Sequence, residues 1–544
     1  MKPVKPIVYY LDTNFPTLWK QHIRDGVLSW NQAFEEIGFK DVIEIKDYPK
    51  EDSLFDPENL QYSCIRYVTN PVINAFGPSW TDPRTGEILS ADIVFFHNLT
   101  KILHAWKFTQ TAAVNPEVRK KHLSDQEMGE AIRYVAAHEA GHNLGLPHNM
   151  AASHAFPVDS LRSATFTQKY GTTPSIMDYA RFNYVAQPGD TGVRLSPPDL
   201  GVYDKYSIAW GYQPIYTAKT PEEEYDTLNS WIMAHHTDPM YRFGQQQSPF
   251  FMRDPSSQTE DLGNDVLKAS KYGIANINYI LDSLRSWRLE PDRGYEEIQT
   301  SYNELFAQYN RFIGHIINYL GGVYQSMPIQ SEDKNAFTLV NKAYQQEIIQ
   351  FLFSEMKNQK TMWERKDLLE KFPIRGSLIS DYQSLLLSRI LGKSTLNKLI
   401  TAEGFDANTY TVSNLFTDVS NAIWKSTLKK KTLSEDEMNL QYHFIKFLLK
   451  EGNYVSSGGF RFIFLQGATE QWSCSGLHDH AKEEHIISSG SREGYSTPRI
   501  KAIIYGHIKK SQQILRNAKF SGNEETRYHY QYLLNEIENK LKKQ

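Results

Sequence analysis

The segment from residue 138 to residue 148 reads His-Glu-Ala-Gly-His-Asn-Leu-Gly-Leu-Pro-His, and its side chains can bind a metal ion and activate water. Residues four apart project from one face of a helix, so His138 and His142 can offer imidazole nitrogens to the same ion. Glu139 cannot easily complete the coordination from the same helix. Its carboxylate can instead take a proton from a water molecule that the ion activates. The motif therefore predicts hydrolytic chemistry with Glu139 as the general base.

A third ligand is expected from the turn that follows this helix. Gly145 can adopt the left-handed conformation that ends a helix, and such a turn would bring His148 back toward the ion. Three neutral imidazoles leave zinc one open position for water, as in catalytic rather than structural sites. A ligand glutamate on a later helix is the alternative, but residues 143–220 contain no glutamate. An aspartate ligand stays open among Asp159, Asp178, Asp190, Asp199 and Asp204.

The helix that must position these groups is predicted over about residues 124–143. Ser124 and Glu127 have the spacing of a capping box, and Met128, Ile132 and Val135 follow at helical intervals. A capped helix of this length presents the two histidines and the glutamate together.

Five residues of the segment resemble the extended zinc signature of the metzincin clan of metallopeptidases. These residues are His138, Glu139, His142, Gly145 and His148. A second metzincin signature, the methionine turn, resembles Ser-Ile-Met-Asp-Tyr at residues 175–179. The resemblance implies that Met177 forms an apolar floor beneath the histidines. It also implies that Tyr179 approaches the zinc and stabilises an oxyanion, as in astacin-like and serralysin-like members. A buried tyrosine with a satisfied hydroxyl is the alternative for Tyr179.

A longer likeness points to one group within the clan, the large bacterial zinc-dependent metallopeptidases that join a metzincin module to a long helical region. The resembling stretches are residues 5–12, 30–34, 77–88, 209–212 and 258–263. The group implies export from the bacterial cytoplasm to the periplasm, cell surface or medium. We therefore expect that a signal segment is absent from this chain. Relatives carry further N-terminal domains, so the chain is either a trimmed form or a short relative, and any inhibitory pro-segment would be missing.

The predicted fold is α+β, with a small twisted mixed sheet and an active-site helix followed by a mostly helical region. Strands are predicted over residues 7–11, 42–48, 63–69 and 88–97, with a helix over 18–38 and a turn over 82–86. In metzincins an edge strand binds the extended substrate by strand addition. Either residues 75–80 or residues 88–95 are expected to border the cleft.

Long helical patterns dominate after Thr220, which is expected to cap a helix that begins at Pro221. Further helices are predicted over residues 265–288, 295–320, 334–356, 377–391, 435–449 and 524–541. The expected domains are a catalytic domain over residues 1–215, a helical region over 216–450 and a mostly helical C-terminal segment over 451–544.

The composition and charge of the chain argue against some classes of binding partner. The chain has 544 residues, 40% hydrophobic and 22% charged, with a formal net charge of -4, which argues against nucleic acid as the main partner. No window approaches the roughly twenty apolar residues of a membrane span, and the N-terminus lacks the apolar core of a signal peptide. Cys64 and Cys474 are too few to form a disulfide framework.

Two other clusters contain metal-capable groups. His478, Asp479, His480 and His485 are read as a surface loop, with metal binding as the alternative. The acidic residues Asp254, Glu260, Asp261 and Asp265 could bind calcium, although their spacing misses the EF-hand loop and suits the start of a helix.

The sequence therefore predicts a zinc endopeptidase that acts on a peptide or protein substrate. An exopeptidase with the same mechanism is one alternative. A catalytically silent, zinc-stabilised protein that binds glycan or protein partners is another. The oligomeric state is left open, and no local motif identifies a specificity pocket.

Overall fold

The computed structural model of this chain describes residues 1–248, 252–330, 333–373, 378–452 and 497–542. The chain clusters into two compact units. The N-terminal unit contains residues 1–247 and 256–312, and the C-terminal unit contains residues 248–255 and most of the chain from residue 313 on. The domain boundaries at residues 215 and 450 stay a prediction.

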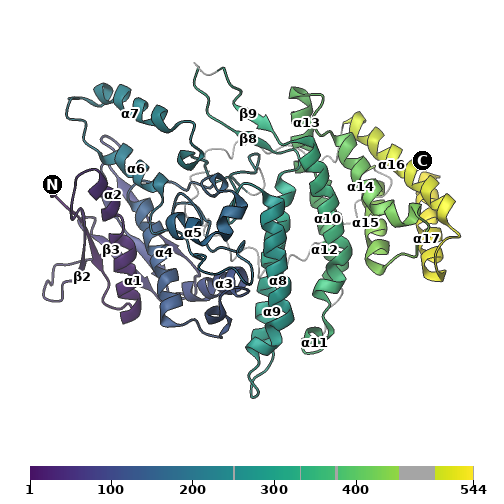
Figure 1. The fold of residues 1–544 in the computed structure, drawn as a ribbon, viewed down its shortest axis with the longest axis horizontal. Helices are drawn as coiled ribbons and strands as arrows, with labels where there is room; N and C mark the ends of the chain where they lie inside the picture. The colour runs from purple at the N-terminus through teal and green to yellow at the C-terminus, as the bar shows by residue number, and fades with distance from the viewer. Residues whose placement is uncertain (249–251, 331–332, 374–377, 453–496, 543–544) are drawn as a thin grey trace. The chain divides into compact units, whose positions relative to one another are not determined.

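The N-terminal unit is built on a five-stranded sheet in the order β2-β1-β3-β7-β4. Four strands are parallel, and β4 pairs antiparallel with β7 at one edge. Strands β2 and β3 of this sheet are labelled in Figure 1. A separate hairpin is formed by β5 and β6. The bounds are β1 Ile7–Leu11, β2 Ile43–Asp47, β3 Ser63–Val68, β4 Ala75–Phe76, β5 Ser79–Thr81, β6 Ile88–Ala91 and β7 Ile93–Phe96.

The first three predicted strands are confirmed, whereas the single strand predicted over residues 88–97 is wrong. The chain leaves the hairpin at Ala91 and enters the main sheet at Ile93, with Asp92 between them. The Asp92 carboxylate accepts a hydrogen bond of 2.7 Å from the Cys64 backbone N–H and pairs with Arg66. This side-chain anchor separates β6 from β7.

The helix predicted over residues 18–38 is also interrupted. It forms α1, Thr17–Leu28, and α2, Asn31–Glu36. At the break the Ser29 hydroxyl donates to the Gly26 carbonyl at 2.6 Å, and the buried Trp30 indole donates to the Ala137 carbonyl at 2.8 Å. The chain therefore bends where Trp30 enters the core.

Three helices pack on the sheet to form the core of the N-terminal unit. They are α1, α3 (Leu99–Thr111) and α4 (Asp125–Asn143). The predicted helix over 124–143 is confirmed as α4, but α3 was not predicted. All residues from Ala105 to Thr111 are buried, including Lys107 and Gln110, so α3 lacks a polar face that would reveal its period.

The rest of the N-terminal unit is a long irregular segment followed by helices α5 to α9. Their bounds are α5 Ala164–Tyr170, α6 Val202–Tyr212, α7 Pro221–His235, α8 Val266–Arg288 and α9 Glu296–Asn318. Helix α7 begins at Pro221 as predicted, but Thr220 makes no side-chain capping bond. The last residues of α9 belong to the C-terminal unit.

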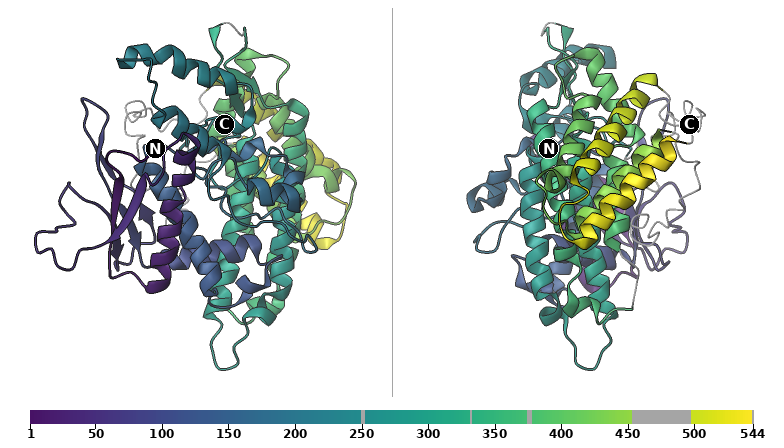
Figure 2. Two further views of the ribbon diagram at one scale, coloured as in Figure 1. Left: turned by 60° about the vertical axis from the view of Figure 1, so that its left-hand side comes forward. Right: turned by 90° about the vertical axis from the view of Figure 1, so that its right-hand side faces the viewer.

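The C-terminal unit is helical apart from the hairpin of β8, Val323–Gln325, and β9, Phe337–Leu339. The right-hand panel of Figure 2 shows its last two helices, α16 and α17, packed side by side. The bounds are α10 Lys342–Trp363, α11 Lys366–Leu369, α12 Leu378–Ile390, α13 Lys393–Phe405, α14 Val412–Leu428, α15 Glu435–Glu451, α16 Pro498–Ala518 and α17 Glu524–Leu541.

The predicted helices over 377–391, 435–449 and 524–541 are confirmed as α12, α15 and α17. The helix predicted over 334–356 is wrong in its bounds. Strand β9 occupies its first turn, and Asn341 then caps α10, which continues to Trp363. The predicted α+β class, with a small mixed sheet and a mostly helical remainder, is confirmed.

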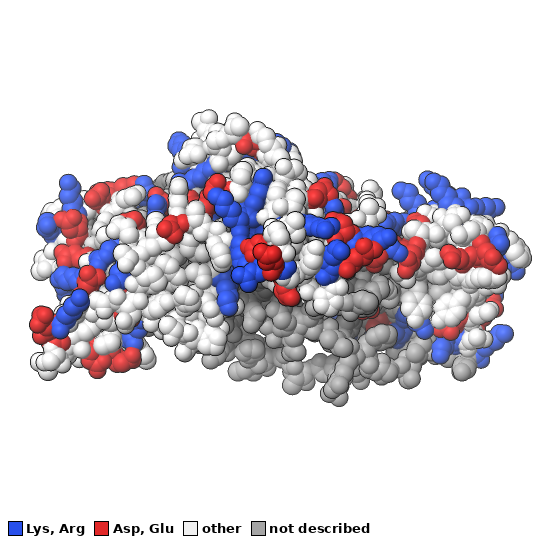
Figure 3. Space-filling model, turned by 90° about the horizontal axis from the view of Figure 1, so that it is seen from below, with Lys and Arg blue, Asp and Glu red and all other residues white. Residues whose placement is uncertain are grey.

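None of the helices in the described part of the chain is long and apolar enough to cross a bilayer. On the face in Figure 3, acidic and basic side chains are interspersed rather than gathered into one basic field. His478, Asp479, His480, His485 and Cys474 lie outside the described residues.

Candidate metal centre and active site

Helix α4 carries the two histidines and the glutamate of the motif. Ser124 caps it by accepting a hydrogen bond of 3.3 Å from the Glu127 backbone N–H. The reciprocal half of the predicted capping box is not formed. The Glu127 carboxylate instead accepts from Asn115 at 2.8 Å and pairs with buried Lys107. The first turn of α4 is thereby tied to α3.

Helix α4 also packs closely against α1. A Cβ atom at Gly26 would lie 2.4 Å from the Arg133 carbonyl oxygen, so only glycine allows this approach. The helix that carries the motif is therefore held from both sides before any ligand is considered.

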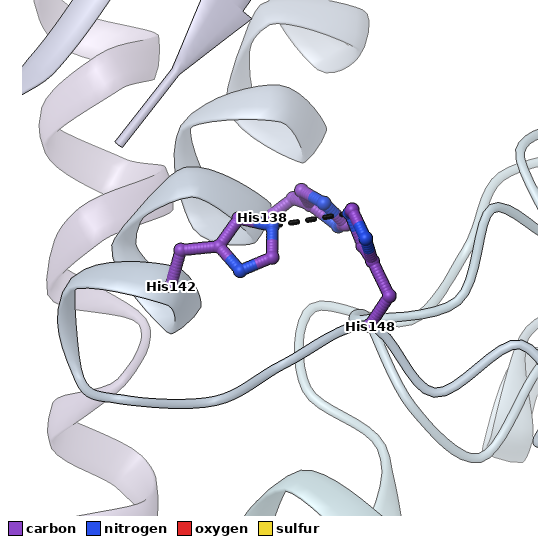
Figure 4. Close-up of side chains that lie close together, drawn as sticks. All are labelled: His138, His142 and His148. Atoms are coloured by element: carbon purple, nitrogen blue, oxygen red, sulfur yellow. Dashed lines mark hydrogen bonds between the residues drawn. The ribbon is translucent and has the colours of Figure 1, made fainter. Parts of the chain in front are cut away.

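The three predicted ligand histidines converge (Figure 4). One ligand nitrogen from each lies within 4.8 Å of the other two. Gly145 has the expected positive φ of 88°, and the turn after α4 brings His148 opposite His142, with their Nε2 atoms 3.1 Å apart. The geometry places His148 where the sequence predicts it.

Backbone carbonyls orient two of these rings. His138 Nδ1 lies 2.7 Å from the Ile176 carbonyl oxygen, and His142 Nδ1 lies 2.8 Å from the Leu146 carbonyl oxygen. Because each Nδ1 donates its proton there, each Nε2 keeps a lone pair for a ligand. His138 Nε2 is buried and has no hydrogen-bond partner among the described residues. Burial, followed by the nearby His142 and His148, lowers the pKa of His138 well below its usual value, which favours the neutral ligand form.

Glu139 lies beside this cluster and is 6% exposed. Burial raises the pKa of its carboxyl to about 8, and a hydrogen bond with the Gly77 backbone partly opposes that shift. Its Oε2 atom is buried without a hydrogen-bond partner in the described part of the chain. A cation held by the histidines would counter the rise in pKa. A carboxylate of this kind, with an acceptor oxygen still available, suits a general base.

The methionine-turn segment, which we define as residues 171–186, lies beneath the histidines. Met177 is fully buried, and a Cβ atom at Gly141 would lie 2.3 Å from its sulfur. Gly141, between Glu139 and His142 in the motif, therefore makes room for Met177. The Asn149 backbone N–H donates to the Met177 carbonyl at 3.1 Å, which ties this segment to the loop that carries His148.

A comparison of the sequence with models of known protein families identifies the family of this chain. A family model described as Met-zincin matches residues 120–431, more than half of the chain. This chain belongs to the Met-zincin family. Searches of curated proteins and of solved structures found no match. The family and the three-histidine cluster together indicate a zinc metallopeptidase.

The donor set of this Met-zincin fits zinc. Zinc–nitrogen bonds of 2.0–2.1 Å at a tetrahedral centre place two ligand nitrogens about 3.3 Å apart. The 3.1 Å separation between His142 Nε2 and His148 Nε2 is close to that value. The buried Nε2 of His138 supplies the third lone pair. The calcium expectation has no such support, because the described residues contain no acidic cluster arranged around a metal.

Three of the four acidic residues considered for calcium have other roles in the Met-zincin. Glu260 pairs with Arg181 and Arg311, Asp265 caps α8, and Asp254 accepts a hydrogen bond from the Gln325 backbone. The aspartates considered as zinc ligands are engaged away from the histidines as well: Asp159 with Lys268, Asp178 with the Ser153 backbone, Asp190 with Arg162, Asp199 with Arg133 and Arg194, and Asp204 with the methionine turn.

Asp204 is the positioning residue that sequence reasoning missed. It is fully buried in α6 and accepts three hydrogen bonds of 2.7 Å, from the Ser175 hydroxyl and from the Ile176 and Gly201 backbone N–H groups. Ile176 in turn orients His138, so Asp204 supports a ligand through one intervening residue. Burial raises the pKa of the Asp204 carboxyl to about 6. No local pattern distinguishes Asp204 from its neighbours in sequence.

Tyr179 packs against two of the three histidines. It is 8% exposed, and its ring centroid lies 4.7 Å from that of His148 and 5.3 Å from that of His138. Of the two segments that could border the cleft, residues 75–76 form the edge strand β4, whereas β7 is an interior strand. Gly77, directly after β4, approaches Glu139 so closely that a Cβ atom would lie 2.8 Å from the Glu139 carbonyl oxygen.

Proposed function

We propose that this Met-zincin is a zinc-dependent endopeptidase in which His138, His142 and His148 hold the metal and Glu139 is the general base. The observation that carries the proposal is the pairing of oriented, neutral imidazoles with an adjacent buried carboxylate that keeps a free acceptor oxygen. A purely structural zinc site has no need of such a base. A bound zinc ion would supply Lewis-acid chemistry, activating water and polarising the substrate carbonyl.

Glu139 moves the proton in this scheme. It accepts a proton from the attacking water as the oxygen of that water forms a bond to the peptide carbon. When the carbon–nitrogen bond breaks, Glu139 passes the same proton to the departing amine, so no further acid is required. Its burial raises the pKa of the carboxyl, and a cation held by the histidines would lower it again, so that Glu139 is ionised before it accepts the proton.

Two further parts of the site have roles in this proposal. Tyr179, packed against His138 and His148, would donate its hydroxyl proton in a hydrogen bond to the developing oxyanion. The edge strand β4 has one side without a partner among the described strands, and an extended peptide can add there as a strand. The position of Gly77, between β4 and Glu139, supports binding of the scissile bond near the metal.

The test compares the zinc-loaded protein with its Glu139→Gln variant on an unbiased peptide mixture, with cuts mapped by mass spectrometry. We expect internal cuts in the wild type and a loss of about 10²–10⁴-fold in the variant, the range for general-base catalysis. Zinc content, measured on the same samples, should be unchanged. An equally active variant would refute the role of Glu139. Trimming from chain ends alone would indicate an exopeptidase, and no cuts by either zinc-loaded protein would favour the binding-protein alternative.

Tyr179→Phe is the matched test of the oxyanion role, since it removes a single hydroxyl group. Loss of one such donor is expected to lower kcat by about 10²–10³-fold. Tyr184→Phe is the control, because Tyr184 is also a buried tyrosine of this segment but its hydroxyl accepts from the Leu262 backbone. Equal effects of the two substitutions would argue against a role of Tyr179 in the reaction.

A further inference from the structure

A small recess opens directly beside the catalytic groups. His138 and Glu139 form part of its lining, together with Trp106, Tyr134, Tyr179 and Arg181. Its volume is about 20 Å³, which is room for about one water molecule. A recess of this size next to the reacting groups can receive one oxygen atom of a polar group but excludes a bulky aromatic side chain.

Arg181 contributes a fixed positive charge to this lining. Its side chain is only 3% exposed. The guanidinium lies over the Trp106 ring, 3.2 Å from the centroid, and 4.8 Å from the centroid of the Tyr179 ring. Both rings hold the guanidinium in place by cation–π contact, and an arginine stays charged even when it is buried.

The charge of Arg181 is only partly balanced. Glu260 is its carboxylate partner, 5% exposed, with Oε1 3.1 Å from Arg181 Nε but not aligned for a hydrogen bond. Glu260 also pairs with Arg311, so two guanidinium groups share one carboxylate. Glu260 holds this position with a positive φ of 67°, which is unusual for a residue other than glycine. Arg181 and Glu260 are buried and Arg311 is partly buried, and the three groups together carry one net positive charge.

A second donor in the recess points to the same class of ligand. The Trp106 indole N–H is buried and has no acceptor among the described residues. A buried donor without a partner is unfavourable, and a ligand that supplies an acceptor oxygen removes that cost. Glu139, an acceptor in the lining, is hydrogen-bonded with the Gly77 backbone and lies beside the histidine cluster, where a cation held by the histidines would balance its charge.

We propose that Arg181 selects substrates that place a carboxylate in this recess. The proposal rests on the proposed peptidase function and names its substrate class. The carboxylate can come from an aspartate side chain next to the cleaved bond or from the terminal carboxylate of a short peptide. The small volume disfavours aromatic side chains.

The experiment uses peptides that differ only in the residue on either side of one cleavable bond, with aspartate, asparagine, glutamate or phenylalanine there. Each is made with a free and with an amidated C-terminus. We expect kcat/KM of the wild type to favour aspartate over asparagine by about 10- to 100-fold, the range for a hydrogen bond to a charged group. A preference that survives amidation identifies the side chain as the source of the carboxylate, and one seen only with free acids identifies the chain terminus.

Two variants attribute the preference. Arg181→Gln should bring the ratio of aspartate to asparagine close to one, and Arg181→Lys should retain part of it. Arg311→Gln is the matched control, because it removes the other guanidinium bound to Glu260 but does not line the recess, so the ratio should be unchanged. The proposal is overturned if the wild type does not distinguish the carboxylate peptides, or if Arg181→Gln retains the full preference while remaining folded.

A binding measurement separates this proposal from the peptidase function. The same peptides are titrated into the zinc-loaded Glu139→Gln protein, in the presence and absence of Arg181→Gln, by calorimetry. Tighter binding of carboxylate peptides that requires Arg181 supports the recess proposal even when no peptide is cleaved. Cleavage without any carboxylate preference in rate or binding supports the peptidase and overturns the role of Arg181.

Discussion

The methionine-turn segment, residues 171–186, and the last four helices, α14 to α17, are held in opposite ways. Every residue of the segment is buried, although it contains no helix or strand. Individual polar side chains hold it: Asp178 accepts from the Ser153 backbone, Asn183 donates to the Leu161 carbonyl, and Asp204 accepts three hydrogen bonds. The helices instead pack through apolar stripes, such as Leu440, Phe444 and Leu448 of α15.

The two regions should therefore differ in how well they tolerate amino-acid substitutions. A hydrogen-bonded anchor has no substitute when its one acceptor is removed, and the groups it leaves behind are buried without partners. An apolar stripe shares its contribution among many contacts, so a side chain of similar volume replaces another at little cost. The segment beneath the histidines should therefore be sensitive to single changes, and the helices α14 to α17 should be robust.

Removal of zinc is expected to have the largest effect on this contrast. A ligand present at 1,000 times its Kd stabilises the folded state by about 4 kcal/mol. Chelation should therefore raise hydrogen exchange in α4 and in residues 171–186, and leave α14 to α17 unchanged. Peptide-resolved exchange before and after chelation, with zinc added back as the control, measures this. A uniform rise across all four helices would show that the two regions are not independent.

Asp204→Ala is expected to have the next largest effect. It leaves the Ile176 and Gly201 N–H groups buried without an acceptor, at about 1–3 kcal/mol each, so we expect a loss of about 3 kcal/mol in free energy of unfolding. Zinc affinity should fall about 10- to 100-fold, because Ile176 orients His138. Urea unfolding and a zinc-binding titration measure the two effects. Asp204→Asn is the control, since its carbonyl oxygen can still accept from both N–H groups.

Lowering the pH should change the stability of the two regions in opposite directions. Burial lowers the pKa values of His507 in α16 and His529 in α17 to about 4, from an unfolded value of about 6.5. Between pH 6.5 and 4 the unfolded chain binds more protons at these positions, so they reduce stability as the pH falls. The double variant His507→Gln/His529→Gln should remove most of this acid sensitivity in α16 and α17, as followed by hydrogen exchange.

The carboxyl groups of the methionine-turn region act in the other direction. Burial raises the pKa values of Asp178 to about 7 and of Asp204 to about 6. The folded state therefore binds more protons at these two groups, and their contribution to stability increases as the pH falls toward 4. The lowered pKa of His138 has the opposite effect, because its protonation at low pH destabilises the folded state. Comparing the acid response of the zinc-free protein with that of its zinc-free Asp204→Asn variant isolates the contribution of Asp204. An acid response unchanged by Asp204→Asn would contradict this assignment.

Leu448→Met should have the smallest effect. Leu448 is fully buried in α15, and a volume-conserving change in such a stripe costs less than about 1.5 kcal/mol. Leu448→Ala, which leaves a cavity, should cost about 2–5 kcal/mol and serves as the matched control. Urea unfolding measures these losses. If Leu448→Met and Asp204→Ala lower the free energy of unfolding equally, the apolar stripe and the polar anchor do not differ in their tolerance to substitution.

The same contrast explains which predictions succeeded. Helices α8, α12, α15 and α17 were predicted close to their observed bounds, because an apolar stripe of helical period is visible in the sequence itself. Helix α3 was not predicted, because its buried polar residues hide that period. The break between α1 and α2, and that between β6 and β7, depend on contacts of Trp30 and Asp92 with residues distant in sequence.

The sequence by itself determined the local part of the site. His138, Glu139 and His142 share a helix face by geometry alone, and Gly145 permits the turn that follows. The tertiary structure decided the rest, since the recess with Arg181, the approach of Met177 to Gly141 and the anchoring of the methionine turn by Asp204 join distant segments. Backbone geometry acts over a few residues and can be read from spacing. Buried hydrogen bonds and charge pairs form only when distant segments meet, so no local pattern encodes them.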